Sequence, residues 1–328
     1  MIVGRRIALP RRLEPQLATL VTRAPEGDGW LHELKLDGYR LLGRIDQGRV
    51  TLFTRNGEDW TARFPAVAKA LAQLRVNDAW LDGEVVVLDG HHVSSFQLLQ
   101  EALSSGRDED LLYFAFDLLY VDGVDIRGAP LEQRKSALKA LFPSGRTPIH
   151  FLAAMAGQGP AVLAHACARG FEGIVSKRRD APYRDGRGHD WVKTKCVMRQ
   201  EFVIGGFTDS DKGLDFGALL LGVHDAAGNL TYAGRVGTGF TAESRRALRS
   251  RLIGLERKNA PFSSPPTGRD ARGVHWVKPE LVAEVAFTNR TRDGRLRHPA
   301  FQGLREDKRP RQVVDEYPIR RGSTRRRP

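Results

Sequence analysis

The sequence has few of the features that mark secreted, zinc-binding or membrane proteins. Its 328 residues include two cysteines, Cys167 and Cys196. Their small number suits a reducing cytosol, and their spacing matches no zinc-site pattern. No apolar run approaches the roughly 18 residues that a membrane-spanning helix needs, and no hydrophobic signal segment follows Met1. These absences predict a cytoplasmic protein with no membrane partner.

Acidic residues are also scarce relative to basic ones. Asp and Glu number 39 against 52 Lys and Arg, which gives a formal net charge of +13, and arginine supplies 41 of the 52. The last eleven residues, Pro318–Pro328, hold five arginines and no acid, so the remainder keeps 13 − 5 = +8. Arginine matches phosphate geometry, and a polyanion partner is therefore a natural inference. On charge alone, a merely soluble basic protein remains an equal alternative.

The first part of the chain shows the patterns of mixed strands and helices. The first 29 residues are proline-rich and basic and predict a surface arm. Strands follow within Trp30–Thr54, with a reversal at residues 46–49. Further strands are predicted at Trp80–Leu88, Leu111–Tyr120, Gly173–Ser176 and Trp191–Lys195, and helices at Pro65–Leu74, Pro130–Leu141 and Pro160–Arg169.

After Cys196 the pattern changes to short strands separated by Gly and Asp or Asn turns. One helix is predicted between Thr241, a plausible N-cap, and Leu255. Strands are predicted at 202–207, 218–223, 230–236 and 282–288. Many short strands with one helix favour a small β-barrel such as an OB-fold. We therefore divide the chain into an arm (1–29), a first domain (30–197), a barrel domain (198–316) and a basic tail (317–328).

A lysine in the segment Glu33-Leu34-Lys35-Leu36-Asp37-Gly38 is the first candidate for chemistry. Strict alternation along a strand places Glu33, Lys35 and Asp37 on one face. The amine of Lys35 could act as a nucleophile if its surroundings lower its pKa. Taken alone, however, a K-x-D-G tetrapeptide is more typical of a solvated hairpin.

Charged residues also interrupt other predicted strands. Glu84 lies in an apolar strand, where a carboxylate is costly unless it is paired or binds a metal; exposure on an edge strand is an equal alternative. Lys193 and Lys195 share one strand face and repel each other unless an anion lies between them, which would indicate a phosphate site. The alternative is that they form a basic strand edge exposed to solvent. Strict alternation places Lys177 opposite Glu172, which gives Lys177 less weight.

In order and spacing, these clusters resemble the nucleotidyltransferase motifs of ATP-dependent DNA ligases. The matching segments are Lys35–Arg40, Thr54–Gly57, Asp82–Glu84, Phe116–Leu118, Glu172–Lys177, Trp191–Lys195 and Arg305–Lys308. Residues 171–178, 200–206 and 295–299 are similar to the ligase module of the bacterial end-joining ligase LigD. The resemblance spans about residues 30–310. It implies an α+β fold: an ATP-grasp-like nucleotidyltransferase domain of antiparallel sheets with flanking helices, followed by an OB-fold β-barrel.

The resemblance also implies a three-step reaction. Lys35 would attack the α-phosphate of ATP and carry AMP, AMP would pass to a DNA 5′-phosphate, and a 3′-hydroxyl would then displace it. The implied roles are adenine recognition by Glu33, base stacking by Phe116, ribose binding by Arg40 with Glu84, metal binding (Mg²⁺ or Mn²⁺) by Glu84 and Glu172, α-phosphate binding by Lys193 and Lys195, nick-phosphate binding by Arg55, and pyrophosphate orientation by Arg305, Asp307 and Lys308.

The implied partner is nicked or broken double-stranded DNA in a bacterial nucleoid, with Ku as a candidate protein partner and a monomeric chain. We expect Lys193, Lys195, Arg40 and a metal to lower the pKa of Lys35, against the opposing effect of Glu33 and Asp37. The barrel would swing about Val197–Gln200 during the reaction. Three alternatives remain: an RNA ligase, a capping-type enzyme that shares the motif order, or a non-catalytic nucleic-acid-binding protein.

Overall fold

The computed structural model of the protein describes residues 4–142, 148–210, 213, 215–291 and 294–316. The predicted basic tail, residues 317–328, lies outside the described residues. The chain divides into two compact units, Met1–Cys196 (with Pro318–Pro328) and Val197–Tyr317. Each unit is described below by itself. In the described ranges, no helix is both long and apolar enough to cross a membrane.

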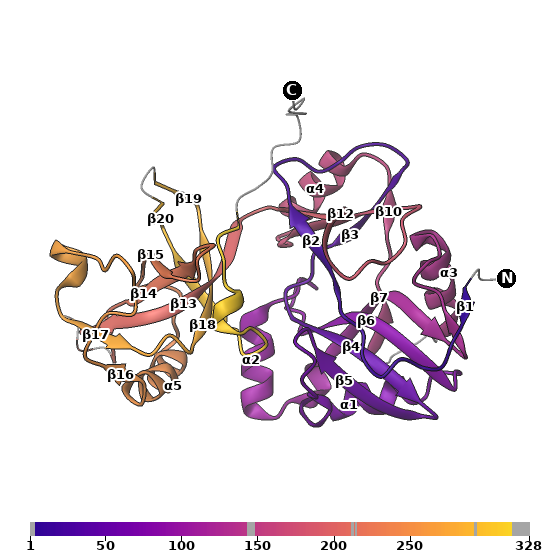
Figure 1. The fold of residues 1–328 in the computed structure, drawn as a ribbon, viewed down its shortest axis with the longest axis horizontal. Helices are drawn as coiled ribbons and strands as arrows, with labels where there is room; N and C mark the ends of the chain where they lie inside the picture. The colour runs from indigo at the N-terminus through magenta and orange to yellow at the C-terminus, as the bar shows by residue number, and fades with distance from the viewer. Residues whose placement is uncertain (1–3, 143–147, 211–212, 214, 292–293, 317–328) are drawn as a thin grey trace. The chain divides into compact units, whose positions relative to one another are not determined.

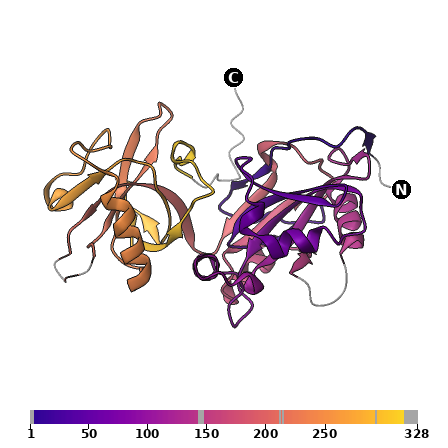
Figure 2. The same cartoon turned by 90° about the horizontal axis from the view of Figure 1, so that it is seen from below.

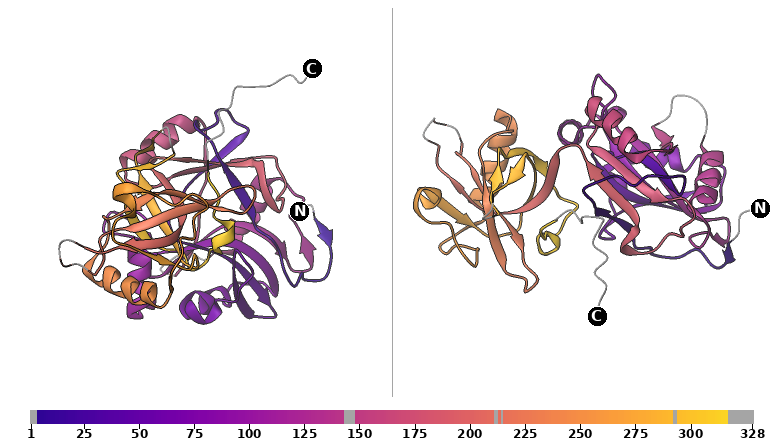
Figure 3. Two further views of the ribbon diagram at one scale, coloured as in Figure 1. Left: turned by 60° about the vertical axis from the view of Figure 1, so that its left-hand side comes forward. Right: turned by 90° about the horizontal axis from the view of Figure 1, so that it is seen from above.

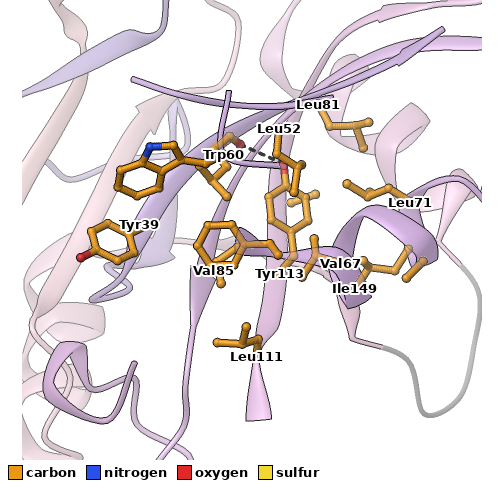
Figure 4. Close-up of a cluster of buried hydrophobic side chains, with 14 of the residues drawn as sticks. Tyr39, Leu52, Trp60, Val67, Leu71, Leu81, Val85, Leu111, Tyr113 and Ile149 are labelled. Carbon is orange, nitrogen blue, oxygen red and sulfur yellow. Dashed lines mark hydrogen bonds between the residues drawn. The ribbon is translucent and has the colours of Figure 1, made fainter. Parts of the chain in front are cut away.

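The first unit contains a large, mainly antiparallel sheet (Figure 1). Its strands, in spatial order, are β1 (Arg5–Arg6), β8 (Val124–Asp125), β7 (Leu112–Val121), β6 (Asp78–Val86), β4 (Tyr39–Asp46) and β5 (Arg49–Thr54), and β9 (Ile149–Phe151) runs parallel to β7. Helices α1 (Pro65–Leu71) and α2 (Phe96–Ser105) contribute apolar side chains to the core on one face. In that core the Tyr113 hydroxyl donates to the Leu41 carbonyl at 3.1 Å, beside Leu52 and Val67 (Figure 4).

A second sheet of five strands lies in the same unit. Its order is β10 (Met155–Ala156), β3 (Trp30–Leu34), β11 (Gly173–Arg178), β12 (Gly186–Lys195) and β2 (Gln16–Leu20). Helix α4 (Gly159–Ala168) packs against β11 and β3, and α3 (Leu131–Leu141) packs against β7. A third apolar cluster joins side chains of both sheets, among them Leu42, Trp80, Phe116 and Trp191. Residues far apart in the sequence therefore meet where the two sheets face each other.

The second unit consists of curved strands around a separate apolar core (Figure 2, Figure 3). The long strand β13 (Met198–Thr208) pairs with three others: β14 (Leu219–His224), β17 (Val274–Val277) and β18 (Val282–Phe287). The remaining strands are β15 (Leu230–Val236), β16 (Glu256–Arg257), β19 (Asn289–Arg290), β20 (Leu296–Arg297) and β21 (Ala300–Leu304). Helix α5 (Ala242–Ile253) buries Leu248 and Leu252 in this core. The predicted combination of an α+β domain and a small barrel is confirmed.

Most elements begin and end close to their predicted limits. Thr241 caps α5 as predicted, because its hydroxyl accepts from the Ser244 N–H at 3.0 Å. One prediction was wrong, and one helix was missed. The first 29 residues do not form a surface arm, since β2 pairs parallel with β12 and buries Gln16 and Leu20. Helix α2 was not predicted, although Ser95 caps its start and Gly106 (φ +68°) ends it.

The two cysteines are paired with each other. Cys167 on α4 and Cys196, which follows β12, form a disulfide with a Cα–Cα distance of 5.3 Å. The cysteine content had suggested only a reducing compartment, and the sequence carried no signal for the pairing because 29 positions separate the two residues. The bond joins the helix before β11 to the end of β12.

Candidate functional site

Lys35 lies directly after β3, beside the start of β11. Its backbone N–H donates to the Gly173 carbonyl at 2.9 Å, which continues the β3–β11 pairing by one step. Its Nζ donates to Glu172 Oε2 at 2.5 Å, and Lys195 Nζ lies 3.5 Å from Glu172 Oε1. Two amines from different strands therefore share one buried carboxylate.

Gly173 explains how Glu172 reaches this position. Its φ of +154° is rarely adopted by residues with a side chain, and an added Cβ would lie 2.1 Å from the Thr194 carbonyl oxygen. Glu172 precedes the strand, so the alternation that holds within β11 does not extend to it. The prediction that Lys177 and Glu172 lie on opposite faces, with Lys177 away from the site, was wrong for this reason.

A second buried carboxylate, Glu33, is also shared by two amines. Lys135 Nζ lies 2.5 Å from Glu33 Oε1, and Lys177 Nζ lies 2.7 Å from Glu33 Oε2. Lys135 also donates to the carbonyl of Leu152 at 2.9 Å. Glu33 and Lys177 come from neighbouring antiparallel strands, whereas Lys135 comes from α3.

Two aromatic rings complete this part of the site. Lys177 Nζ lies 4.3 Å from the centre of the Phe116 ring and 3.9 Å from the Trp191 ring. The two rings meet edge to face with centroids 6.0 Å apart. The predicted base-stacking residue therefore lies beside the predicted adenine-recognising carboxylate, with a lysine linking the two.

Sequence reasoning did not find Lys135, although a signal was present. The buried residues of α3 are Leu131, Arg134, Lys135 and Leu138, at spacing i, i+3, i+4 and i+7. This is the inward stripe of an amphipathic helix, and two cations on such a stripe require buried anions. Arg134 meets that requirement through two hydrogen bonds to Asp117, at 2.8 and 2.9 Å. Lys135 meets it through Glu33.

Arg40 is held by a carboxylate that sequence reasoning did not single out. Its guanidinium donates to both oxygens of Asp82, at 2.9 and 2.5 Å, while Glu84 Oε1 accepts from the Gly38 N–H at 3.1 Å. Arg40 and Glu84 are paired in the backbone register of β4 and β6. The Tyr183 hydroxyl donates to Asp82 at 2.7 Å and thereby fixes the same carboxylate. Arg40 still faces the aromatic pair, 5.3 Å from the Phe116 ring.

The side chains around Lys35 raise its pKa, whereas the prediction of a lowered pKa counted a metal among its causes. Burial favours the neutral amine, but the carboxylates of Glu172, Glu84 and Asp37 outweigh that effect and hold the proton. The neighbouring cations do not reverse the balance in this arrangement. Lys177 shows the contrary behaviour, because burial lowers its pKa despite the adjacent Glu33.

The two predicted metal ligands, Glu84 and Glu172, both act on Lys35 electrostatically. The part of the chain that the structure describes contains no group of three or more His, Cys, Asp or Glu side chains arranged to hold a metal ion. Two carboxylates suit Mg²⁺ or Mn²⁺ when phosphate oxygens and water supply the other ligands, which is the usual arrangement for Mg²⁺ with a nucleotide. The residues present therefore fit a metal that arrives with its substrate.

The other predicted residues lie in three places. Lys193 pairs with Val175 in the β11–β12 register and shares a strand face with Lys195. Arg55 lies in the turn after β5. In the second unit, Arg305 donates to Asp307 and to Glu284, at 2.8 and 2.9 Å, and Lys308 Nζ lies 2.8 Å from Glu201.

Lys35 therefore pairs with a buried carboxylate that a second lysine shares, and a lysine amine is one of the nucleophiles that form covalent intermediates in enzymes. Residues 15–195 match the family model of the ATP dependent DNA ligase domain, and residues 212–308 match that of the ATP dependent DNA ligase C terminal region. The chain belongs to the ATP-dependent DNA ligase family.

Individual proteins show the same relationship. The chain is 46% identical over 321 residues to the multifunctional non-homologous end joining protein LigD of Pseudomonas aeruginosa, and 40% identical over 308 residues to that of Mycobacterium tuberculosis. These alignments cover 96% and 93% of this chain but 38% and 40% of the relatives. The chain therefore spans about two fifths of the length of these curated relatives. A structure of mycobacterial DNA ligase D complexed with ATP and MES matches with a TM-score of 0.70 and 39% identity, over 93% of this chain and 98% of that one.

Proposed function

We propose that the chain seals DNA breaks that carry a 5′-phosphate and a 3′-hydroxyl, using ATP and a lysyl-AMP intermediate on Lys35, in repair by end joining. The observation that carries the proposal is the pairing pattern around Lys35 and Glu33. Each of the two buried carboxylates serves two lysines, Glu172 with Lys35 and Lys195, and Glu33 with Lys135 and Lys177. A nucleotide supplies the anions that such an arrangement of amines attracts.

In the first step the Lys35 Nζ attacks the α-phosphorus of ATP. A nitrogen–phosphorus bond forms, the bond from that phosphorus to the bridging oxygen breaks, and pyrophosphate leaves. Lys193 and Lys195 bind the α-phosphate oxygens and neutralise the charge that develops there. Glu84 and Glu172 hold the divalent cation, which supplies further neutralisation of phosphate charge when bound.

Lys35 must lose its proton before it attacks, and Glu172 is the group that controls this. While Glu172 accepts from Lys35, the amine keeps its proton and is not nucleophilic. Glu172 and Glu84 would hold a divalent cation, and a Glu172 carboxylate engaged in that way would no longer hold the Lys35 proton. Burial would then favour the neutral amine of Lys35.

Base recognition falls to the second shared carboxylate. Glu33 accepts from the adenine amino group, Phe116 stacks on the ring, and Lys177 is placed to donate to an adenine ring nitrogen. Guanine reverses the donor and acceptor on that edge, so the same pair selects ATP over GTP. Arg40, fixed by Asp82, and Glu84 bind the ribose.

The later steps take place on DNA. AMP passes from Lys35 to the 5′-phosphate, which Arg55 binds, and the 3′-hydroxyl then displaces AMP. We propose that Arg305, Asp307 and Lys308 orient pyrophosphate when the second unit moves about Val197–Gln200. Binding to DNA weakens with salt, with a log–log slope of about −0.9 for each phosphate neutralised. The protein acts as a monomer on the bacterial nucleoid in the cytoplasm, with Ku as a partner at broken ends.

The test is intact-mass spectrometry before and after addition of ATP and Mg²⁺, followed by a sealing assay. Wild type gains one adenylate and seals a nicked DNA duplex, whereas Lys35→Ala does neither. Lys139→Ala, on the exposed side of α3, is the matched control and behaves as wild type. Absence of adenylate on wild type refutes the proposal. Labelling by GTP, or sealing of RNA but not DNA, would assign the chain to a capping-type enzyme or an RNA ligase instead.

A further inference from the structure

The Cys167–Cys196 pair encloses a part of the chain that holds three of the phosphate-binding and metal-binding candidates. The covalent loop from Cys167 to Cys196 contains Glu172, Lys193 and Lys195. Cys196 is the last residue of the first unit, and the next residue, Val197, opens the second unit and is 49% exposed. Cys196, one end of the disulfide, thus lies between the end of β12 and the point where the chain leaves the first unit.

The segments that carry the two sulfurs are held close together by backbone hydrogen bonds as well. The Cys196 N–H donates to the Glu172 carbonyl at 2.8 Å, and Gly173 pairs with Lys195 in the β11–β12 register. At the other side, the Phe171 N–H donates to the Ala166 carbonyl at 3.0 Å and closes the end of α4. These bonds keep the two cysteines adjacent whether or not the sulfurs are joined.

Both cysteines are half-buried, so small reagents reach them from solvent. Disulfides in proteins of reducing compartments are mostly transient and serve catalysis or redox sensing, whereas stable structural ones belong to oxidising compartments. A ligase that works on chromosomal DNA operates in a reducing compartment. A permanent structural role for this bond therefore conflicts with the proposed function, and a reversible role does not.

We propose that Cys167 and Cys196 form a reversible redox site that is oxidised by peroxide and reduced by dithiols, and that its disulfide slows turnover on DNA. The inference rests on the proposed function for its effect on sealing, but not for the thiol chemistry itself. The oxidised form restrains Cys196, the residue just before the segment about which the second unit is proposed to move. The disulfide adds a covalent tether to the backbone hydrogen bond that already holds Cys196, so motion at Val197 begins from a more restrained chain.

The chemistry balances with hydrogen peroxide as the oxidant. One thiolate attacks a peroxide oxygen, a sulfur–oxygen bond forms, the oxygen–oxygen bond breaks, and the released hydroxide takes a proton to become water. The second thiolate attacks the sulfenic sulfur, the sulfur–sulfur bond forms, and the sulfenic oxygen leaves as a second water. Two thiols lose two electrons and two protons, and one peroxide is reduced to two waters. A dithiol reverses the change by two thiol–disulfide exchanges.

The catalytic strands keep the described geometry in the oxidised form. Lys35 and Lys195 both contact Glu172 with the disulfide closed. Oxidation should therefore leave single-turnover adenylation of Lys35 within about twofold of the reduced rate. Multiple-turnover nick sealing, which needs repeated movement of the second unit, should fall by roughly tenfold, a value within the usual range of coupling between sites.

The experiment uses the full chain, reduced with dithiothreitol, desalted, and titrated with hydrogen peroxide. Alkylation followed by mass spectrometry counts the remaining thiols, and a non-reducing gel distinguishes a bond within one chain from a bond between chains. Both thiols of wild type should disappear together in the monomer and return with dithiothreitol. The oxidised monomer should also melt several degrees higher than the reduced one, because the bond restricts the unfolded chain.

The double variant Cys167→Ser with Cys196→Ser is the control. It should seal nicks at the reduced wild-type rate both with and without peroxide. Thiols that remain alkylatable after peroxide treatment, or oxidised wild type that seals as fast as reduced wild type, would overturn the proposal. If reduced wild type seals no nick at all, the proposed function fails instead, while the thiol count still decides whether the redox pair exists.

Discussion

Two clusters of buried charge, one in each unit, have opposite ratios of cations to carboxylates. In the first unit, Glu172 and Glu33 each serve two lysines, so amines outnumber carboxylates within these pairs. In the second unit, Arg305 alone serves two carboxylates, Asp307 and Glu284. The pKa of Arg305 is raised well above its usual range, because these carboxylates outweigh the effect of burial.

This difference indicates that the lysine cluster of the first unit attracts an anion, whereas the charges of the Arg305 cluster are paired with one another. Amines that share a carboxylate gain from any phosphate placed between them, whereas the bidentate Arg305–Asp307 pair already satisfies its donors and acceptors. Arg305 and Asp307 can orient pyrophosphate only by giving up part of this pairing. We therefore expect changes in the first cluster to act mainly on catalysis, and changes in the second to act first on stability.

The largest effect is expected from Glu172→Gln. The amide cannot balance two lysines or bind a divalent cation as a carboxylate does, so adenylation of Lys35 should fall by roughly 100-fold or more. Stability should fall less than rate, because Lys35 is 22% exposed and Glu84 and Asp37 still balance its charge. Single-turnover labelling by ATP and calorimetry measure the two quantities. A large loss of stability with little loss of rate would break the comparison.

Asp307→Asn tests the other side of the comparison. Arg305 would lose its bidentate partner while remaining mostly buried, and the second unit should lose about 3 kcal/mol of its free energy of unfolding. Glu306→Gln is the matched control, since Glu306 is exposed on the surface and paired with Arg251. Hydrogen exchange of β18 and β21 locates the loss. Equal stabilities of the two variants would show that the Arg305 pair contributes nothing to folding.

Lys135→Met tests whether Glu33 needs both of its lysine partners, because the variant leaves it paired with Lys177 alone. The KM for ATP should rise by about tenfold, which corresponds to loss of one charged hydrogen bond that holds Glu33 in place. The preference for ATP over GTP should weaken, while kcat changes little. Lys135→Arg should restore part of the loss. An increase in KM that is equal for ATP and GTP would indicate general damage rather than loss of base selection.

The smallest effect concerns pH. Because the folded pKa of Lys35 lies above its ordinary value of 10.5, the rate of adenylation should rise with pH across the neutral and alkaline range. The same shift stabilises the fold fully below the unfolded pKa, and this contribution is lost as pH rises through the folded pKa. Asp37→Asn should move the rate profile to lower pH, since Asp37 helps to hold the proton. A flat profile in wild type would contradict the raised pKa.

The sequence alone was enough to find the residues that follow local rules. The strand around Glu33 and the lysine pair at 193 and 195 were placed correctly because alternation within one strand decides which side chains share a face. The barrel was likewise predicted from the short strands and the Gly and Asp or Asn turns after Cys196, whereas the α+β fold of the first domain was implied by the resemblance to DNA ligases.

The partners of these residues were not predictable in the same way. Lys135 and Glu33 are 102 residues apart in the sequence, and Arg40 and Asp82 are 42 residues apart. Both ion pairs therefore depend on how helices and strands pack. The position of Glu172 depends on the unusual backbone angle of Gly173, which alternation rules do not include. The direction of the Lys35 pKa shift depends on which carboxylates lie within reach, and that is a property of the folded arrangement.

The parallel pairing of β2 with β12 has a mechanical consequence. Leu20 lies opposite Lys193 in the register, and the Val21 N–H donates to the Lys193 carbonyl at 3.0 Å. β12 would otherwise be the outer strand of its sheet on this side, free to flex along its edge. The segment around Gln16–Val21 therefore supports the outer edge of β12, and the rigidity of Lys193, the proposed phosphate ligand, depends on residues that precede every recognised motif.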